Sequence, residues 1–246
     1  EGEPIILCAH LDRVKPGKGI KPIIDKGIIK SSGNTVLAAD DIAGVVAILS
    51  GLREVKKRKP LPAGEVIFTV SEETRLQGSK HLDFSRIKSK MAYVFDSTNP
   101  VGTVVTSSPT HIEYEAHIMG QAAHAAVNPH DGISAIRAAA FIISKLPFGW
   151  INGYTTTNVG ILNGGLATNI VSDSVRFKGE IRSLVAKRAL DLASEFKSTI
   201  ISEAEAHGAK ADVKSEVQYD GYTIDTSEPV ISRITEALRK IDMTPV

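Results

Sequence analysis

Short apolar runs alternate with amphipathic stretches along the first hundred residues. Three runs, at 4–7, 65–70 and 91–95, are nearly continuous in apolar character and predict buried strands of a sheet that is covered on both faces. Between the first two runs, apolar residues recur at helical spacing, namely Ile42, Val45, Val46, Leu49 and Leu52. This order of elements predicts an α/β layer structure.

The pattern changes near residue 111, where the stretch HIEYEAHIM alternates strictly between apolar and polar positions. Such alternation is typical of a half-buried antiparallel strand. The following segments predict a helix, two strands, a helix and a last strand, at 133–145, 155–161, 175–182, 186–207 and 211–218. The resulting βαββαβ order is the ferredoxin-like split-βαβ pattern of α+β domains.

The helical stretch 228–241 follows this unit, and we assign it to the first domain. The predicted organisation is therefore a discontinuous first domain, residues 1–106 and 221–246, with residues 107–220 inserted as a second domain.

Charge and composition remove several classes of partner. The 29 Lys and Arg residues balance 28 Asp and Glu residues, so the formal net charge of +1 does not favour binding to nucleic acid or to an anionic membrane. No uncharged run is long enough to span a bilayer. The only cysteine, Cys8, has no partner for an intrachain disulfide. We therefore expect a protein of a reducing, cytoplasmic compartment.

Potential metal ligands gather just beyond the ends of the predicted strands and before the first helix: His10, Asp12, Asp40, Asp41, Glu72, Glu73 and Asp96. Ligands bind open α/β sheets at the carboxyl ends of the strands. Singly, each has an ordinary explanation, since an aspartate caps helices and a Glu pair suits a solvated loop. Together, crowded carboxylates need cations, and mixed His and carboxylate ligation suits zinc, manganese or cobalt better than calcium.

Seven ordered segments carry a resemblance to a known family: AHLDRVKPGKGIKP, TVLAADDIAGVVAIL, FTVSEETRLQGSKHLD, VFDS, GQAAHAAVNPHDGISAI, GGLATNIVSD and FKGEIRS. They resemble the peptidase T-like, tripeptide aminopeptidase-like branch of the dinuclear zinc exopeptidases, in the aminoacylase and glutamate carboxypeptidase superfamily. The resemblance implies an α/β zinc-exopeptidase domain with a mixed sheet and an inserted α+β ferredoxin-like lid and dimerisation domain. It also implies hydrolysis of short peptides from the amino end.

The resemblance implies two divalent metal ions, zinc in first place with cobalt or manganese as alternatives. His10 and Asp96 are similar to ligands of one ion, Asp40 to the carboxylate that bridges both ions, and Glu73 to a ligand of the second. Asp12 resembles the catalytic-site carboxylate that orients a ligand imidazole. For Asp41 two interpretations stay open: it begins the helix, or it contacts and orients the metal ligands.

Glu72 resembles the general base of the family, which takes a proton from water and delivers it to the leaving amine. The residues themselves support a division of roles between Glu72 and Glu73. Consecutive side chains of an extended chain point to opposite sides, so one carboxylate faces a metal while its neighbour faces the water.

In the inserted domain, His124, Asn169 and Arg182 resemble substrate-binding residues. His124 is similar to a histidine that reaches the substrate carbonyl, in some relatives from a partner subunit, and Arg182 would suit a terminal carboxylate. Without a role in substrate binding, His124 would be a surface histidine, Asn169 a turn residue and Arg182 a surface charge at the end of a strand. The expected partners are a short peptide and a second copy of the chain, bound through the lid.

Departures from the family pattern keep alternatives open. Ile42 follows the Asp pair where relatives often carry a polar residue, and Arg75 stands in EETRL where EE-x-G-L is more usual. The family continues beyond MTPV to a final histidine ligand, so we expect a fragment, truncated at both ends and inactive alone. The alternatives are an N-acyl amino acid or related amide hydrolase, and a non-catalytic metal- or peptide-binding homologue.

Overall fold

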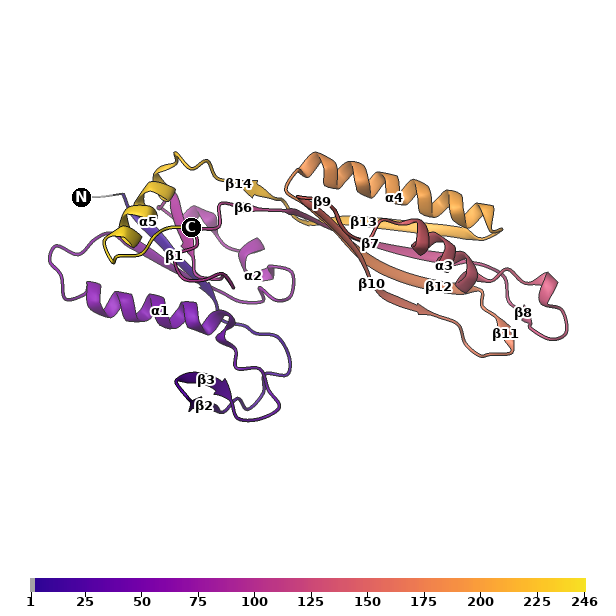
Figure 1. The fold of residues 1–246 in the computed structure, drawn as a ribbon, viewed down its shortest axis with the longest axis horizontal. Coiled ribbons are helices and arrows are strands. Elements are labelled where there is room, and N and C mark those ends of the chain that lie inside the picture. The colour runs from indigo at the N-terminus through magenta and orange to yellow at the C-terminus, as the bar shows by residue number, and fades with distance from the viewer. Residues whose placement is uncertain (1–2) are drawn as a thin grey trace. The chain divides into compact units, whose positions relative to one another are not determined.

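The computed structural model describes residues 3–246, which divide into two compact units (Figure 1). Unit 2 runs from Val105 to Thr226, and unit 1 comprises the chain on either side of it. The sequence-based boundaries, 107 and 220, differ from these by a few residues. No helix among the described residues has the length and apolar character needed to cross a membrane.

Unit 1 contains a parallel sheet of three strands in the order β4-β1-β5, formed by β1 (Ile5–His10), β4 (Gly64–Thr69) and β5 (Met91–Val94). The helix α1 (Ala39–Val55) lies between β1 and β4 in the chain and packs on β1. The remaining elements are β2 (Pro22–Asp25), β3 (Ile28–Ser31), α2 (Gln77–Lys80), a 3-10 turn (Phe84–Arg86) and α5 (Pro229–Arg239).

The register of this sheet brings the carboxyl ends of its strands to one edge. His10 pairs with Thr69, and Cys8 pairs with Val94. Residues that follow these strands therefore leave the sheet side by side. The small core beneath them consists of Ala9, Val45 and Ile48, with Leu7, Leu52 and Phe68 packed against it.

Unit 2 is an antiparallel sheet of five strands in the order β13-β7-β12-β10-β9. Its strands are β7 (Thr110–Met119), β9 (Gly149–Asn152), β10 (Thr155–Gly164), β12 (Ser174–Ser183) and β13 (Lys210–Tyr219). The helices α3 (Ala135–Lys145) and α4 (Ala186–Ala206) pack on one face of this sheet (Figure 1). Two-stranded ribbons are formed by β6 (Ser107–Ser108) with β14 (Tyr222–Thr223) and by β8 (Ala123–His124) with β11 (Ile170–Val171), and a 3-10 turn spans Pro129–Asp131.

The strict alternation seen in the sequence builds the core of unit 2. Ile112, Ala116 and Ile118 of β7 are at most 1% exposed and form one core with Phe177 of β12 and Ile200 of α4. The intervening polar residues of β7 lie on the other face.

The predicted fold class is confirmed in both units. The insertion contains the predicted βαββαβ elements and one strand that the sequence analysis did not predict, β9, which lies at the edge of the sheet next to β10. One detail is different, because the described sheet of unit 1 is parallel throughout rather than mixed. Its consecutive strands are joined by long connections, one of which contains α1, and such crossovers return the chain in the same direction.

Candidate active site

His10, the last residue of β1, is the centre of the site. It is 3% exposed, and its two ring nitrogens face different carboxylates. The Nε2 atom lies 2.9 Å from Oδ1 of Asp40 and 3.9 Å from Oδ2 of Asp96. The Nδ1 atom lies 3.4 Å from Oδ1 of Asp12. Burial lowers the pKa of His10, but the nearby carboxylates, Asp40 first, outweigh burial and raise it.

Asp12 connects the loop after β1 to the loop after β4. Its carboxylate accepts hydrogen bonds from the backbone N–H groups of Glu72, at 2.9 Å, and Glu73, at 3.2 Å. Burial raises the pKa of Asp12, but these two donors outweigh burial and lower it. Asp12 therefore faces His10 and at the same time accepts hydrogen bonds from the backbone that carries the two glutamates.

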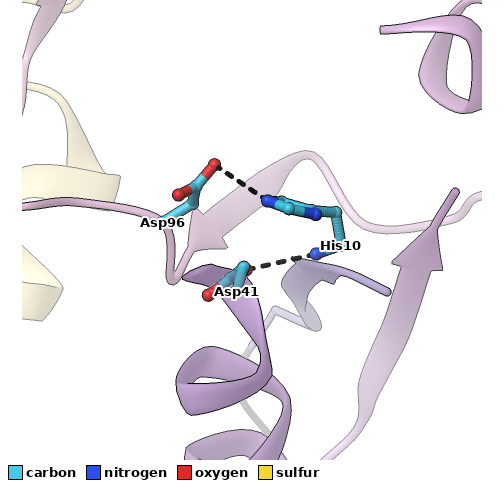
Figure 2. A group of neighbouring side chains, drawn as sticks. All are labelled: His10, Asp41 and Asp96. Carbon is cyan, nitrogen blue, oxygen red and sulfur yellow. Dashed lines mark hydrogen bonds and ion pairs between the residues drawn. The ribbon is translucent and has the colours of Figure 1, made fainter. Parts of the chain in front are cut away.

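Asp40 and Asp41 precede the regular turns of α1, since both have non-helical backbone angles, and the peptide bond between them is cis. Asp41 is 2% exposed and accepts hydrogen bonds from the backbone N–H groups of His10, at 3.1 Å, and Gly44, at 3.2 Å. It thereby caps the helix and ties it to β1 (Figure 2).

Two overlapping groups among the described residues have the geometry to hold a metal ion: His10 with Asp41 and Asp96, and His10 with Glu72 and Glu73. In each group the potential ligand atoms lie within 4.8 Å of one another. Figure 2 shows the first group, with the imidazole directed at Asp96. Both oxygens of Asp41 already accept backbone N–H groups, whereas the more exposed Asp40 has its Oδ1 atom 2.9 Å from Nε2 of His10.

The chemistry of these donors fits a divalent cation. Burial raises the pKa of Glu72, and the charges of Asp96, Glu73 and Asp12 raise it further. Burial also raises the pKa of Asp96, and Asp40 adds to that effect. Carboxylates that destabilise one another in this way are stabilised by a bound cation, and the imidazole suits zinc and similar ions.

The loop that carries the glutamates has unusual backbone angles. Ser71, Arg75 and Leu76 all have positive φ, and the value for Arg75 is 71°. The sequence comparison with EE-x-G-L raised doubt about this loop. In the structure Arg75 adopts the left-handed backbone conformation that favours glycine, at the position where the family pattern has glycine.

Two of the three candidate residues of unit 2 lie together on the ribbon of β8 and β11. His124 pairs with Ile170, and the carbonyl of the adjoining Asn169 accepts the N–H of Ala125 at 2.9 Å. The Nδ1 atom of His124 accepts the N–H of Ala126 at 3.2 Å, which leaves Nε2 as the donor of a neutral imidazole. Both side chains are exposed and open to a ligand.

Arg182 lies at the other end of β12 from this ribbon (Figure 1). Its Nε and Nη2 atoms donate to the two carboxylate oxygens of Glu180, at 3.0 and 3.2 Å, and Nη1 donates to the hydroxyl of Tyr219 at 3.1 Å. The sequence analysis missed these partners. The i, i+2 spacing of Glu180 and Arg182 on one strand face was an available signal, whereas the position of Tyr219 depends on the pairing of β13 with β7.

Models of two known protein families match this chain. Residues 1–139 match the model of peptidase family M28, and residues 106–208 match the peptidase dimerisation domain. Protein YqjE of Bacillus subtilis is 39% identical over 241 residues, which are 97% of this chain and 65% of that protein.

Among solved structures, a tripeptidase from Staphylococcus aureus superimposes with a TM-score of 0.94 at 35% identity, over 98% of this chain and 65% of that one. Aminopeptidase PepT from Bacillus cereus gives 0.89 at 39% identity, over 99% and 66%. The chain thus spans about two thirds of the length of these relatives. It belongs to the M20/M28 peptidase family, with a catalytic-type α/β domain and a dimerisation domain.

Proposed function

We propose that the protein is a metal-dependent aminopeptidase that hydrolyses short peptides, with two divalent ions, zinc in first place, and Glu72 as general base. The observation that carries the proposal is the convergence of His10, Asp40, Asp96 and the Glu72–Glu73 pair at one edge of the sheet. Membership of this peptidase family supports it.

His10, Asp40 and Asp96 would hold one ion, and Asp40 and Glu73 would contribute to the second. When bound, such ions polarise the scissile carbonyl and lower the pKa of the attacking water. Asp12 keeps the imidazole of His10 and the backbone of both glutamates in place. Glu72 takes the proton from the water and gives it to the leaving amine, a role worth about 10² to 10⁴ in rate.

His124 and Asn169 are proposed to contact the substrate, with the free Nε2–H of His124 directed to the carbonyl oxygen. Arg182 lies about 26 Å from the ribbon end of β12, given about 3.3 Å per residue of strand. A tripeptide is about 10 Å long, so it cannot contact both ends of one lid. We propose a homodimer in which His124 and Asn169 serve the partner's site, and the match to a peptidase dimerisation domain supports the homodimer.

A direct test compares hydrolysis of trialanine, of trialanine with a blocked amino terminus, and of N-acetyl-alanine by metal-loaded full-length protein. We expect release of the amino-terminal residue from free trialanine, loss of activity after chelation, and recovery with added zinc. Preferential cleavage of N-acetyl-alanine would instead indicate an amide hydrolase. Metal binding without cleavage of any of these compounds would indicate a non-catalytic homologue.

A further inference from the structure

The chain that follows His124 is closed into a turn by hydrogen bonds that the proposed chemistry does not use. The Oδ1 atom of Asn128 accepts the backbone N–H of His124 at 3.1 Å. In return, the carbonyl of His124 accepts the N–H groups of Asn128, at 3.1 Å, and of Val127, at 3.2 Å. Residues 124–128 therefore form one tight turn that begins at the histidine.

This turn determines what the imidazole of His124 contacts. Ala126, in the middle of the turn, donates its N–H to Nδ1 of His124 at 3.2 Å. A ring nitrogen that accepts a hydrogen bond carries no proton, so the proton of the neutral imidazole lies on Nε2. Because Ala126 reaches the ring only when the turn is closed, Asn128 acts on the imidazole through the backbone.

Asp131 in turn holds the amide group of Asn128. The Nδ2 atom of Asn128 donates to Oδ2 of Asp131 at 3.0 Å, and the carbonyl of Asn128 accepts the N–H of Asp131 at 3.1 Å. A carboxylate only accepts hydrogen bonds, so it takes the NH2 group of the amide and leaves Oδ1 for the N–H of His124. Asp131 therefore fixes which amide atom of Asn128 faces the histidine.

A glycine brings this pair close to the ribbon of β8 and β11. Gly132, the next residue, lies where a Cβ atom would come within 2.9 Å of the side chains of Ala123 and Val171. Since real Cβ atoms do not make such close contacts, a larger residue would push the chain away from the ribbon. Glycine thus lets the 3-10 turn that carries Asp131 approach the ribbon that carries His124.

We propose that Asn128 and Asp131 are positioning residues, which hold His124 in the Nε2–H tautomer and direct this donor at the substrate carbonyl. The inference rests on the proposed function, in which His124 contacts the substrate. The side chains of the pair are exposed, so each hydrogen bond alone contributes little to stability. Their importance lies in direction, because displacing a catalytic group by about 1 Å can cost about a hundredfold in rate.

The kinetic test uses metal-loaded full-length protein and trialanine. For Asn128→Ala we expect kcat to fall about tenfold with little change in KM, because a misdirected donor stabilises the transition state less without weakening ground-state binding. Asn152→Ala is the matched control, since Oδ1 of Asn152 closes another turn of unit 2 by accepting the N–H of Tyr154 at 3.0 Å. An equal loss of activity in both variants would contradict the proposal.

Exchanging the two side chains tests whether they act as a pair. Asn128→Asp alone places two carboxylates side by side and removes the donor to Asp131, so kcat should fall. In the double variant Asn128→Asp with Asp131→Asn, the amide at position 131 can donate to the carboxylate at position 128, which still accepts the N–H of His124. We expect most of the activity to return, and no recovery would overturn the proposal.

A spectroscopic measurement separates this inference from the proposed function. NMR signals of the ring nitrogens distinguish the two neutral tautomers, and those of His124 are assigned by their loss in His124→Ala. We expect the Nε2–H tautomer in the wild type and in Asn152→Ala, and a mixture of tautomers in Asn128→Ala, whether or not the protein cleaves peptides. This result without hydrolysis in the wild type would reject the aminopeptidase function and retain the positioning pair. Equal spectra of wild type and Asn128→Ala would overturn the positioning pair.

Discussion

The two units of the molecule are stabilised in different ways. Unit 2 has an extensive apolar core that draws on its three central strands, on β13 and on both helices, and its strands are regular. Unit 1 has a small core cluster of three buried apolar residues, and its strand ends are joined by hydrogen bonds from backbone N–H groups to the carboxylates of Asp12 and Asp41. Polar contacts therefore contribute to the stability of unit 1, whereas the stability of unit 2 depends mainly on apolar packing.

The largest expected effect tests the division of labour within the Glu72–Glu73 pair. Glu72→Gln should lower kcat by about 10² to 10⁴ and keep the metal content, because it removes a proton acceptor but no proposed ligand. Glu73→Gln should weaken metal binding. Metal analysis and peptide hydrolysis measure both, and equal metal loss in the two variants would refute the assignment.

A substitution in the core of unit 2 tests the apolar side of the comparison. Phe177 is fully buried, so Phe177→Ala should lower the free energy of unfolding of unit 2 by about 3 to 5 kcal/mol. Hydrogen exchange of β7 and β12 during urea unfolding reports on this unit. Phe148→Ala, at a side chain that is 80% exposed, is the control and should have little effect. A similar loss of stability in both variants would contradict the described packing.

Substitution of Asp41 tests how much the buried polar contacts stabilise unit 1. Asp41→Ala leaves the N–H groups of His10 and Gly44 without their acceptor, and we expect a loss of about 2 to 3 kcal/mol from the cap and the buried donors. Asp25→Ala removes only an exposed ion pair and should cost at most about 1 kcal/mol. Urea unfolding followed by hydrogen exchange in α1 gives both values. Equal stability of the two variants would show that this polar contact does not hold unit 1.

His124 tests whether unit 2 contributes to turnover as well as to packing. His124→Ala should lower kcat about tenfold or more and leave metal content unchanged, because the side chain is exposed on a ribbon. His130→Ala, at an exposed histidine in the same unit, should retain activity. If the partner's site uses His124, mixing His124→Ala with Glu72→Gln protein restores part of the activity. No recovery after verified subunit exchange excludes the trans arrangement.

The smallest effect concerns a charge pair in unit 2. Burial raises the pKa of Glu180, but Arg182 outweighs burial and holds it below its ordinary value of 4.5. The stabilisation is therefore present above pH 4.5 and is lost as the pH falls through the lower folded-state pKa. Glu180→Gln should flatten this part of the stability profile, measured by urea unfolding between about pH 6 and 3. A profile as steep as that of the surface variant Glu205→Gln would count against the pair.

The sequence predicted what depends on local pattern. The alternation at residues 111–119 identified β7, and the polar residues at strand ends identified His10, Asp12 and Asp96 as neighbours because parallel strands end at one edge. Contacts that depend on strand register, such as the hydrogen bond from Arg182 to Tyr219, could not be predicted from the sequence. The two-residue strands β8 and β11 have no periodicity to detect, although they place His124 beside Asn169.

The ribbon of β6 and β14 has a consequence for modularity. Tyr222 pairs with Ser108, Thr223 pairs with Ser107, and the N–H of Ile224 donates to the carbonyl of Thr106 at 2.7 Å, so the chain enters and leaves unit 2 at adjacent points. A domain with adjacent ends can be inserted into, or removed from, a host loop with little change to the host backbone. Unit 2 is therefore separable from its host chain: a short turn between residues 104 and 227 would close unit 1, and the excised unit 2 could be transplanted or permuted as one piece.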